Sequence, residues 1–345
     1  MKSVMDKETI ILGIETSCDD TAVALVADGK RIIKSLTSSQ IDFHNKFGGV
    51  VPEIASRKHL EALPPMLDEV VLQAGLTKGD IDAIAVTCGP GLVGALLVGV
   101  ATAKALAFGL GIPLVPVNHI MAHVYANFLV YDTISYPLMA LVASGGHSSL
   151  LLMAEEGKVL VVGKTRDDAA GEAFDKVARA LDLGYPGGPV IDELSRQGDP
   201  GAIHFPRAYL KGDHPFDFSF SGLKSAVLNH INSSRQRGEE IFLPDLAASF
   251  QEAVVEVLVN KSVRAAKEYG VKNLLLAGGV AANESLRHRL QKEGEKAGIS
   301  VFIPPLSLCT DNALMVAAAA YPLYAQGVKA PLDLNAVPQL SVEHV

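Results

Sequence analysis

The sequence predicts an α/β fold built from two halves of similar pattern, on three observations. First, apolar strands at residues 10–14 and 21–26 flank the polar turn ETSCDD, and an Asp-Gly pair then turns the chain into a third strand. Second, helical and strand patterns alternate after residue 52, which is typical of a largely parallel sheet. Third, the stretch PLMALVASGGHSSLLLMAEEGKVLVVGK repeats this opening. We therefore expect each half to begin with a three-stranded meander.

The other elements of the first half follow behind its meander. A helical pattern covers residues 52–74, the apolar run IDAIAVTCGPG indicates a strand, and the small residues after Gly91 indicate a helix. In the second half, a helix is expected at AAGEAFDKVARALDL. A segment at about 184–240, dense in Gly, Pro and aromatic residues, then predicts a loop-rich insertion beside a site.

Regular elements resume after the insertion. We expect an amphipathic helix at 246–269, and the run VKNLLLAGGVAANESLRHRL predicts a buried strand, a glycine turn and a helix. A final helix begins near CTDNALMVAAAA, with Asp311 at or just inside its N-terminus. These elements place an N-terminal lobe at 8–130 and a C-terminal lobe at 131–308, with the last helix, 309–328, packing back on the N-terminal lobe.

Composition limits the class of protein. The chain has 345 residues, of which 49% are hydrophobic and 20% charged, so it can bury a large core. A net charge of -8 argues against a general nucleic-acid coat protein, which needs a basic excess. Three widely spaced cysteines fit a reducing compartment, and neither a signal peptide nor a run of membrane-spanning length is evident. We expect a cytoplasmic protein with no membrane partner.

A pair of histidines is the strongest indication of a metal site. His119 and His123, in VPVNHIMAHVYANF, lie four residues apart, so a helix would place both imidazoles on one face. Asp311 and His147 are candidates for a third ligand, and Asp311 is preferred because a carboxylate at a helix start is exposed and oriented. Two imidazoles and one carboxylate suit iron and zinc alike. Two packed, hydrogen-bonded core histidines are the alternative.

Polar and glycine-rich turns indicate a nucleotide site. The turns SGGH (Ser144 to His147), YPGGP and LLLAGGVAAN allow the backbone to approach a ligand closely, and a following helix N-terminus favours an anion. Asp19 and Asp20, in the turn ETSCDD, could position a cation or a nucleophile. Tight packing at the glycines and backbone capping by the aspartates are the alternatives.

Ten ordered motifs, from GIETSCDDTAVAL and FGGVVPEIASRKH through NHIMAH, SGGH, YPGGP and AGGVAAN to CTDN, resemble those of the bacterial tRNA threonylcarbamoyladenosine transferase family over Ile11 to Ala320. The resemblance implies an actin/Hsp70/sugar-kinase-like duplicated two-lobe fold with a nucleotide cleft between the lobes. It also implies transfer of a threonylcarbamoyl group from threonylcarbamoyl-adenylate to the exocyclic amine of the adenosine following the anticodon, with release of AMP. The recipient tRNAs would read codons that begin with A.

The resemblance also implies roles for particular residues and partners. It makes His119, His123 and Asp311 the ligands of one divalent iron or zinc ion, and Asp19 and Asp20 the acidic pair. Our own hypothesis is that Asp19 or Asp20 acts as the base that helps to remove the amine proton. The implied contacts to substrate or to an adenylate or ATP-type nucleotide are Ser144, Gly145, Gly146, His147, Asp175, Gly188, Asp192 and Asn283. To these we add Ala143, beside the SGGH turn, and Gly278 and Gly279 of the glycine turn after the buried strand. The implied partners are tRNA, a catalytically inactive paralogue subunit, a small P-loop ATPase subunit and a separate enzyme that supplies the adenylate.

Three other functions are compatible with parts of the pattern. A metalloprotease would need the glutamate of an HExxH motif, but Ile120, Met121 and Ala122 separate the two histidines. A non-catalytic ATP-binding assembly subunit would not need the two histidines and Asp311 together. A sugar-kinase-like phosphotransferase is possible from the fold alone. Basic residues that could line a path for tRNA are Lys164, Arg166, Lys211, Lys224 and Arg237.

Overall fold

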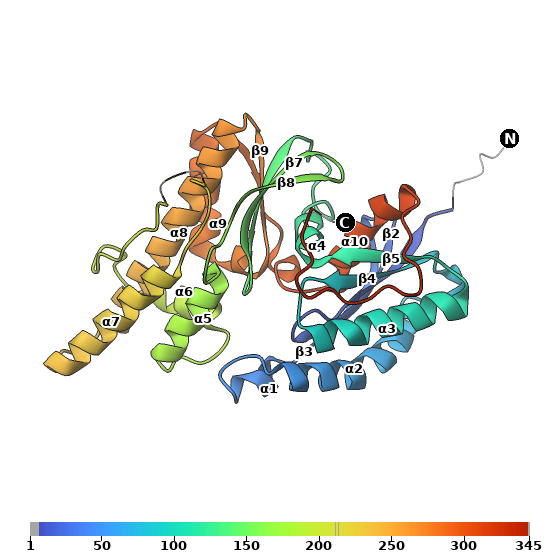
Figure 1. Cartoon of the computed structure of the whole chain (residues 1–345), viewed down its shortest axis with the longest axis horizontal. Helices are drawn as coiled ribbons and strands as arrows, with labels where there is room; N and C mark the ends of the chain where they lie inside the picture. The colour runs from blue at the N-terminus through green and yellow to red at the C-terminus, as the bar shows by residue number, and fades with distance from the viewer. Residues whose placement is uncertain (1–6, 211, 213, 344–345) are drawn as a thin grey trace. The chain divides into compact units, whose positions relative to one another are not determined.

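The computed structural model describes residues 7–210, 212 and 214–343 (Figure 1). The chain divides into two compact units, each built around its own sheet. Unit 1 takes in Met1–Phe43, Val50–Asp132 and Asp311–Val345, and unit 2 takes in His44–Gly49 and Thr133–Thr310.

The sheet of unit 1 has the strand order β3-β2-β1-β4-β5. Its strands are β1 (Ile10–Glu15), β2 (Asp20–Ala27), β3 (Arg31–Ser39), β4 (Ala83–Gly89) and β5 (Leu114–Asn118). The first three strands form the predicted antiparallel meander, and β4 and β5 continue it in parallel with β1. Strands β1 and β4 are buried along their whole length because helices cover both faces of the sheet, as mixed α/β sheets require.

Helices pack on both faces of this sheet (Figure 1). Helices α2 and α3 contact each other and the sheet, and α10 lies against β1, β2, β4 and β5. The helices of unit 1 are α1 (Ile41–Asn45, at the boundary with unit 2), α2 (Pro52–Gln73), α3 (Val93–Leu110), α4 (His119–Tyr125), α10 (Ala313–Ala325) and the 3-10 turn η1 (Lys78–Asp80). Although α10 comes last in the chain, it is thus part of the first unit.

Helix α3 is the one helix in the described residues that is long and apolar enough to cross a membrane by length and composition. Core helices of globular proteins pass the same test. In this fold α3 packs on β4 and α2, and its buried side chains contribute to the core of unit 1. Packing within the unit therefore explains the apolar side chains on the buried side of α3.

The sheet of unit 2 repeats the first in outline, with the strand order β10-β9-β6-β7-β8. Its strands are β6 (Leu138–Ala143), β7 (Ser148–Glu155), β8 (Lys158–Lys164), β9 (Asn273–Ala277) and β10 (Ser300–Phe302). Strands β6, β7 and β8 are an antiparallel meander, while β9 pairs in parallel with β6. The predicted second meander is confirmed.

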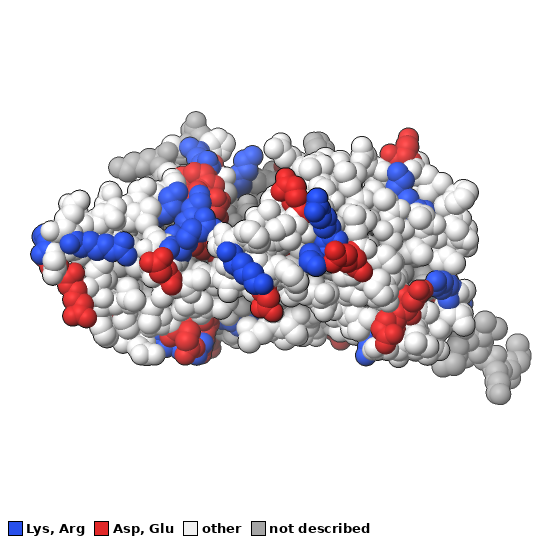
Figure 2. All heavy atoms as spheres, turned by 90° about the horizontal axis from the view of Figure 1, so that it is seen from below, with Lys and Arg blue, Asp and Glu red and all other residues white. Residues whose placement is uncertain are grey.

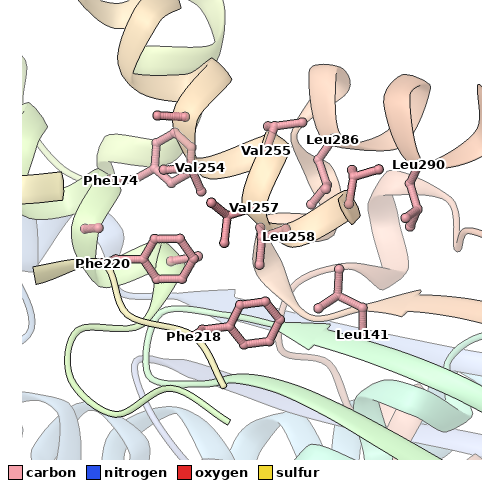
Figure 3. Packing of buried hydrophobic residues seen from close by; sticks show 14 of the residues in the cluster. Leu141, Phe174, Phe218, Phe220, Val254, Val255, Val257, Leu258, Leu286 and Leu290 are labelled. Atoms are coloured by element: carbon pink, nitrogen blue, oxygen red, sulfur yellow. The ribbon is translucent and has the colours of Figure 1, made fainter. Parts of the chain in front are cut away.

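The helices of unit 2 enclose a large apolar core. They are α5 (Ala170–Ala180), α6 (Gly187–Ser195), α7 (Ser221–Arg237), α8 (Leu243–Glu268), α9 (Glu284–Lys296) and the 3-10 turns η2 (Gly279–Ala282) and η3 (Leu306–Leu308). In the core, the ring of Phe174 in α5 meets that of Phe250 in α8 edge to face, with centroids 5.2 Å apart. Figure 3 shows further side chains from α8 and α9 filling the same interior.

Two details of these elements differ from the expectations. The segment 184–240 is less loop-rich than predicted, because it contains α6 and the 17-residue helix α7, and irregular backbone dominates only between them. Asp311 does not lie inside the last helix. Asn312 is the N-cap of α10, its side chain accepting a hydrogen bond from the Met315 amide at 3.0 Å, so Asp311 precedes the cap by one residue.

Candidate functional site

Helix α4 presents the two histidines. It begins directly after β5, and the side chain of its N-cap residue Asn118 accepts hydrogen bonds from the amides of Ile120 at 2.9 Å and Met121 at 3.3 Å. Because His119 and His123 are one turn apart, their rings lie on the same face with centroids 4.7 Å apart. Both residues are buried, at 7% and 1% exposure, so they form an interior site in unit 1.

Asp311 completes a three-residue cluster with them. Its Oδ1 atom lies 3.2 Å from Nε2 of His123 and 3.6 Å from Nε2 of His119. One ligand atom from each residue lies within 4.8 Å of the other two, a spacing that could hold a metal ion. Of the two candidates for a third ligand, the structure therefore brings Asp311 to the histidines, while His147 belongs to unit 2.

The chemistry of the cluster fits a metal ion. Within the described part of the chain, both ring nitrogens of His123 are buried without a hydrogen-bond partner, and an unpaired buried polar atom is costly unless something binds it. Two imidazole nitrogens and one carboxylate oxygen are donors that borderline divalent metals accept. In the described structure, the metal-donor atoms and the buried nitrogens that lack a hydrogen-bond partner therefore lie at one point.

Glu15 is a member of this site that the sequence analysis missed. It is the last residue of β1 and fully buried, with its Oε2 atom 3.2 Å from Nδ1 of His119. Thr87 donates a hydrogen bond to the same oxygen at 2.6 Å, and the Ser17 amide donates to Oε1 at 2.5 Å. Because a carboxylate only accepts, Nδ1 of His119 carries the hydrogen, and the neutral ring keeps its Nε2 lone pair for a metal ion. The sequence signal that could have identified Glu15 is a glutamate at the end of an otherwise apolar strand.

Charges around His119 set its protonation in the metal-free protein. Burial lowers the pKa of His119, but the carboxylates of Asp311 and Glu15 outweigh it and raise the pKa to about 9. Burial also raises the pKa of Glu15, yet the charge and hydrogen bond of His119 hold it below its usual value. A metal ion must displace the proton from His119, so its binding should strengthen as pH rises toward 9.

We expect the substitution Glu15→Gln to weaken metal binding about 10- to 100-fold, because the amide cannot hold His119 with a negative charge. Zinc affinity, measured by competition with a chromogenic chelator, checks this. Glu69→Gln is the control, since Glu69 lies exposed on α2. Equal zinc affinity in the Glu15→Gln variant and the wild type would show that Glu15 has no part in the site.

The acidic turn begins at the same edge of the sheet of unit 1. His59 in α2 helps to fix it, with its Nδ1 atom 2.7 Å from Oγ1 of Thr21 and its Nε2 atom 3.0 Å from the Cys18 carbonyl. Burial raises the pKa of Asp20 to about 7, a hydrogen bond from Ser39 opposing this and the charge of Asp311 adding to it. Asp20 can therefore change protonation state near neutral pH.

The predicted nucleotide residues lie in unit 2, most of them in turns that follow strands. Ser144 to His147 form the turn between β6 and β7, closed by a hydrogen bond from the Ser144 amide to the His147 carbonyl at 2.8 Å. Gly278 follows β9 with a φ of +89°, and a Cβ there would lie 2.4 Å from the carbonyl oxygen of Ala143. Only glycine therefore allows these two strand ends to approach so closely.

The other predicted contacts lie on α5 and α6 and at the start of α9. Asp175 accepts a hydrogen bond from the Gly187 amide at 2.7 Å, which fixes the YPGGP turn, and Gly188 follows in the first turn of α6. Asp192 in α6 accepts a hydrogen bond from Asn283, the N-cap of α9, at 3.1 Å. The structure thus groups these residues within unit 2.

Most of the proposed basic residues are neutralised by neighbouring acids. Three form ion pairs within unit 2, namely Arg166 with Asp217 at 2.8 Å, Lys224 with Asp168 at 2.6 Å and Arg237 with Glu239 at 2.7 Å. Lys164 is exposed, and Lys211 lies outside the described residues. Figure 2 likewise shows acidic and basic side chains interspersed on one face. Of the four basic residues that the structure describes, three are therefore paired with an acid.

Comparison with known sequences assigns the chain to a family. The TsaD family model, described as tRNA N6-adenosine threonylcarbamoyltransferase, matches residues 31–318. A protein of that name from Bacillus cereus is 60% identical over 341 residues, which are 99% of this chain and 98% of that protein. The chain belongs to this family. Members from Geobacillus thermodenitrificans and Moorella thermoacetica are 58% and 56% identical, covering 97% and 96% of this chain and 98% and 97% of their own lengths.

This membership confirms that the chain is a transferase that modifies tRNA. Solved structures of proteins with much lower sequence identity show the same fold. HypF from T. kodakarensis matches with a TM-score of 0.60 at 16% identity, covering 93% of this chain and 48% of that chain. Component A of the (R)-2-hydroxyglutaryl-CoA dehydratase of Acidaminococcus fermentans matches at 0.53 and 17%, covering 92% and 99%. The predicted actin/Hsp70/sugar-kinase-like two-lobe α/β fold is confirmed.

Proposed function

We propose that this member of the transferase family moves a threonylcarbamoyl group from threonylcarbamoyl-adenylate to the exocyclic amine of the adenosine that follows the anticodon, releasing AMP. The recipient tRNAs read codons that begin with A. The observation that supports this best is the convergence of His119, His123 and Asp311 at one buried point in a chain of this family. A non-catalytic relative would not require three metal-binding groups at one point.

The reaction has two chemical requirements. The adenine amine is a weak nucleophile because its lone pair is delocalised into the ring, so the acyl donor needs a good leaving group, and AMP is one. An iron or zinc ion held by His119, His123 and Asp311 would supply a positive charge that binds the donor and offsets developing negative charge. Glu15 orients one of its ligands, and the buried walls of the site keep the ligand geometry fixed.

We further propose that the adenylate is bound by the turns of unit 2. Candidate contacts are the backbone amides of Gly145 and Gly146, in the turn at Ser144 to His147, and of Gly278 and Gly279, with Gly188 at the start of α6. Amides at a turn or helix start favour phosphate oxygens. Asp175, Asp192 and Asn283 then fix the elements that carry these amides.

Asp20 is our proposed general base. Its Oδ1 atom is buried without a hydrogen bond in the described structure, and its pKa of about 7 lets it accept a proton at neutral pH. A base works when ionised, so the transfer rate should rise with pH through this pKa and then level off. Because the negative charge of Asp311 helps to raise the pKa, a cation bound there should lower it, and the midpoint should lie at or below 7.

We expect Asp20→Asn to reduce the transfer rate about 10²- to 10⁴-fold and to remove this rise with pH. Single-turnover rates from preformed adenylate between pH 5 and 9 would show it. Asp19→Asn is the matched variant and should keep the rise. The reverse result, with the pH dependence lost only in Asp19→Asn, would assign the base to Asp19.

Partner proteins are part of this proposal. A chain with a net charge of -8 and few unpaired basic residues near the proposed path needs help to hold a polyanion. We propose that a catalytically inactive paralogue and a small P-loop ATPase share the binding of tRNA, and that a separate enzyme supplies the adenylate in the same cytoplasm. Exposed apolar side chains on α2 and α3, Leu60, Leu72, Leu97 and Phe108, offer a surface for the paralogue.

The proposed function is tested by mass-spectrometric nucleoside analysis of tRNA. Purified protein is incubated with its partners, unmodified tRNA and synthesised threonylcarbamoyl-adenylate. Threonylcarbamoyladenosine is expected only in tRNAs that read codons beginning with A. If no partner combination yields the modified nucleoside, the proposed donor and acceptor are wrong.

A further inference from the structure

Gln251 connects three helices of unit 2 through hydrogen bonds in the interior. It lies on α8 and is 5% exposed. Its Oε1 atom accepts a hydrogen bond from Nδ2 of Asn283 at 2.6 Å, and its Nε2 atom donates to Oγ of Ser195 at 2.8 Å. Ser195 belongs to α6 and Asn283 caps α9, so one side chain joins the helix that carries Gly188 and Asp192 to the start of α9.

The direction of every hydrogen bond in this network is determined by the backbone. The Leu286 amide can only donate, and it lies 2.8 Å from Oδ1 of Asn283, which places Nδ2 of that residue toward Gln251. Gln251 must then present its oxygen to Asn283 and its NH2 group to Ser195. The hydroxyl of Ser195 donates in turn to the carbonyl of Asp192 at 2.7 Å. Neither amide can turn over without losing hydrogen bonds.

The network also determines which of its polar groups is still available to form hydrogen bonds with a ligand. The two hydrogens of Asn283 Nδ2 are taken by Gln251 at 2.6 Å and by Oδ1 of Asp192 at 3.1 Å, so Asn283 has no donor to spare. Asp192 lines a pocket of about 430 Å³ together with Arg196, Ser285 and other residues of α6, α8 and α9. A carboxylate at such a wall can accept further hydrogen bonds from hydroxyl or amine groups, which a nucleoside carries.

We propose that Gln251 is a positioning residue of the nucleotide site, which fixes the amide of Asn283 and through it the carboxylate of Asp192. This inference rests on the proposed binding of the adenylate by unit 2. Without Gln251, one hydrogen of Asn283 loses its acceptor and the oxygen of Ser195 loses its donor, so fewer hydrogen bonds hold the Asn283 amide against Asp192. The expected defect is therefore in ligand binding more than in the chemical step.

The variant Gln251→Met tests this, because methionine keeps the length of the side chain and removes both hydrogen bonds. AMP binding to the full chain is measured by calorimetry, and kcat and KM for threonylcarbamoyl-adenylate are measured with the partners present. We expect AMP affinity to fall and KM to rise about tenfold, with kcat changed less than twofold. The control is Ser262→Ala, which is fully buried on the same helix and whose hydroxyl donates a hydrogen bond to the Leu258 carbonyl of that helix.

A double-mutant cycle separates positioning from general destabilisation. Asn283→Ser keeps a helix cap but is too short to reach Gln251. If Gln251 acts through Asn283, the double variant should bind AMP no more weakly than Asn283→Ser alone. Additive losses, or AMP binding in Gln251→Met equal to wild type, would overturn the positioning role and leave the proposed function standing. If the wild type itself does not bind AMP, the nucleotide site proposed above fails, and this inference fails with it.

Discussion

Replacing His123 by alanine is expected to abolish threonylcarbamoyl transfer from preformed adenylate, with a loss of at least about 10³-fold. The ring is 1% exposed and its two nitrogens have no hydrogen-bond partner in the described structure, so its removal deletes one of three metal donors and little else. A bound metal ion is worth several kcal/mol of charge stabilisation, which corresponds to this loss in rate. Metal content by plasma mass spectrometry should fall in parallel.

His204→Ala is the control for this prediction, because His204 is exposed in unit 2 and has no part in the cluster. It should keep full metal content and full activity. The thermal midpoint separates loss of the metal donor from unfolding and should be compared for the metal-free proteins. A His123→Ala protein that is folded and still transfers the group at the wild-type rate would remove the metal site from the proposed function.

The fold could be predicted from the sequence where pattern and burial agree. The first two strands are apolar and flank a tight polar turn, so β1 and β2 were placed within a residue of their observed bounds. Helix α7 was missed because its N-terminal segment follows a run of Gly, Pro and Phe that indicates a loop. Its exposed face is polar, and only Leu223, Val227 and Ile231 mark the buried side at intervals of four residues.

The site could be predicted only in part, for a different reason. The spacing of His119 and His123 is local and therefore visible in the sequence. The third group comes from a residue almost two hundred positions away, and residue types alone left both Asp311 and His147 as candidates. Glu15 was missed because its role depends on where β1 ends relative to α4, which is a tertiary relation. Sequence patterns indicate which residues can bind a metal, and packing determines which of them meet.

The position of Asp311 depends on a glycine that touches no ligand. Gly13 lies in the middle of β1, and a Cβ there would lie 2.4 Å from the carbonyl oxygen of Ala313 and 3.1 Å from Cβ of Ala317. Both belong to α10, which packs directly on β1. Since Ala313 is two residues after Asp311, an added methyl group must push away the start of the helix that holds this carboxylate near the histidines.

We therefore expect Gly13→Ala to destabilise the protein by about 1–3 kcal/mol through overpacking and also to weaken zinc binding. Chemical denaturation measures the first effect, and chelator competition on the folded protein measures the second. Gly109→Ala is the matched control, since Gly109 lies exposed on α3 with no atom within 4 Å of an added Cβ. That change should be neutral or slightly stabilising, because alanine favours the helix. If the Gly13→Ala protein is less stable but binds zinc as tightly as the wild type, the packing of α10 on β1 does not control the position of Asp311.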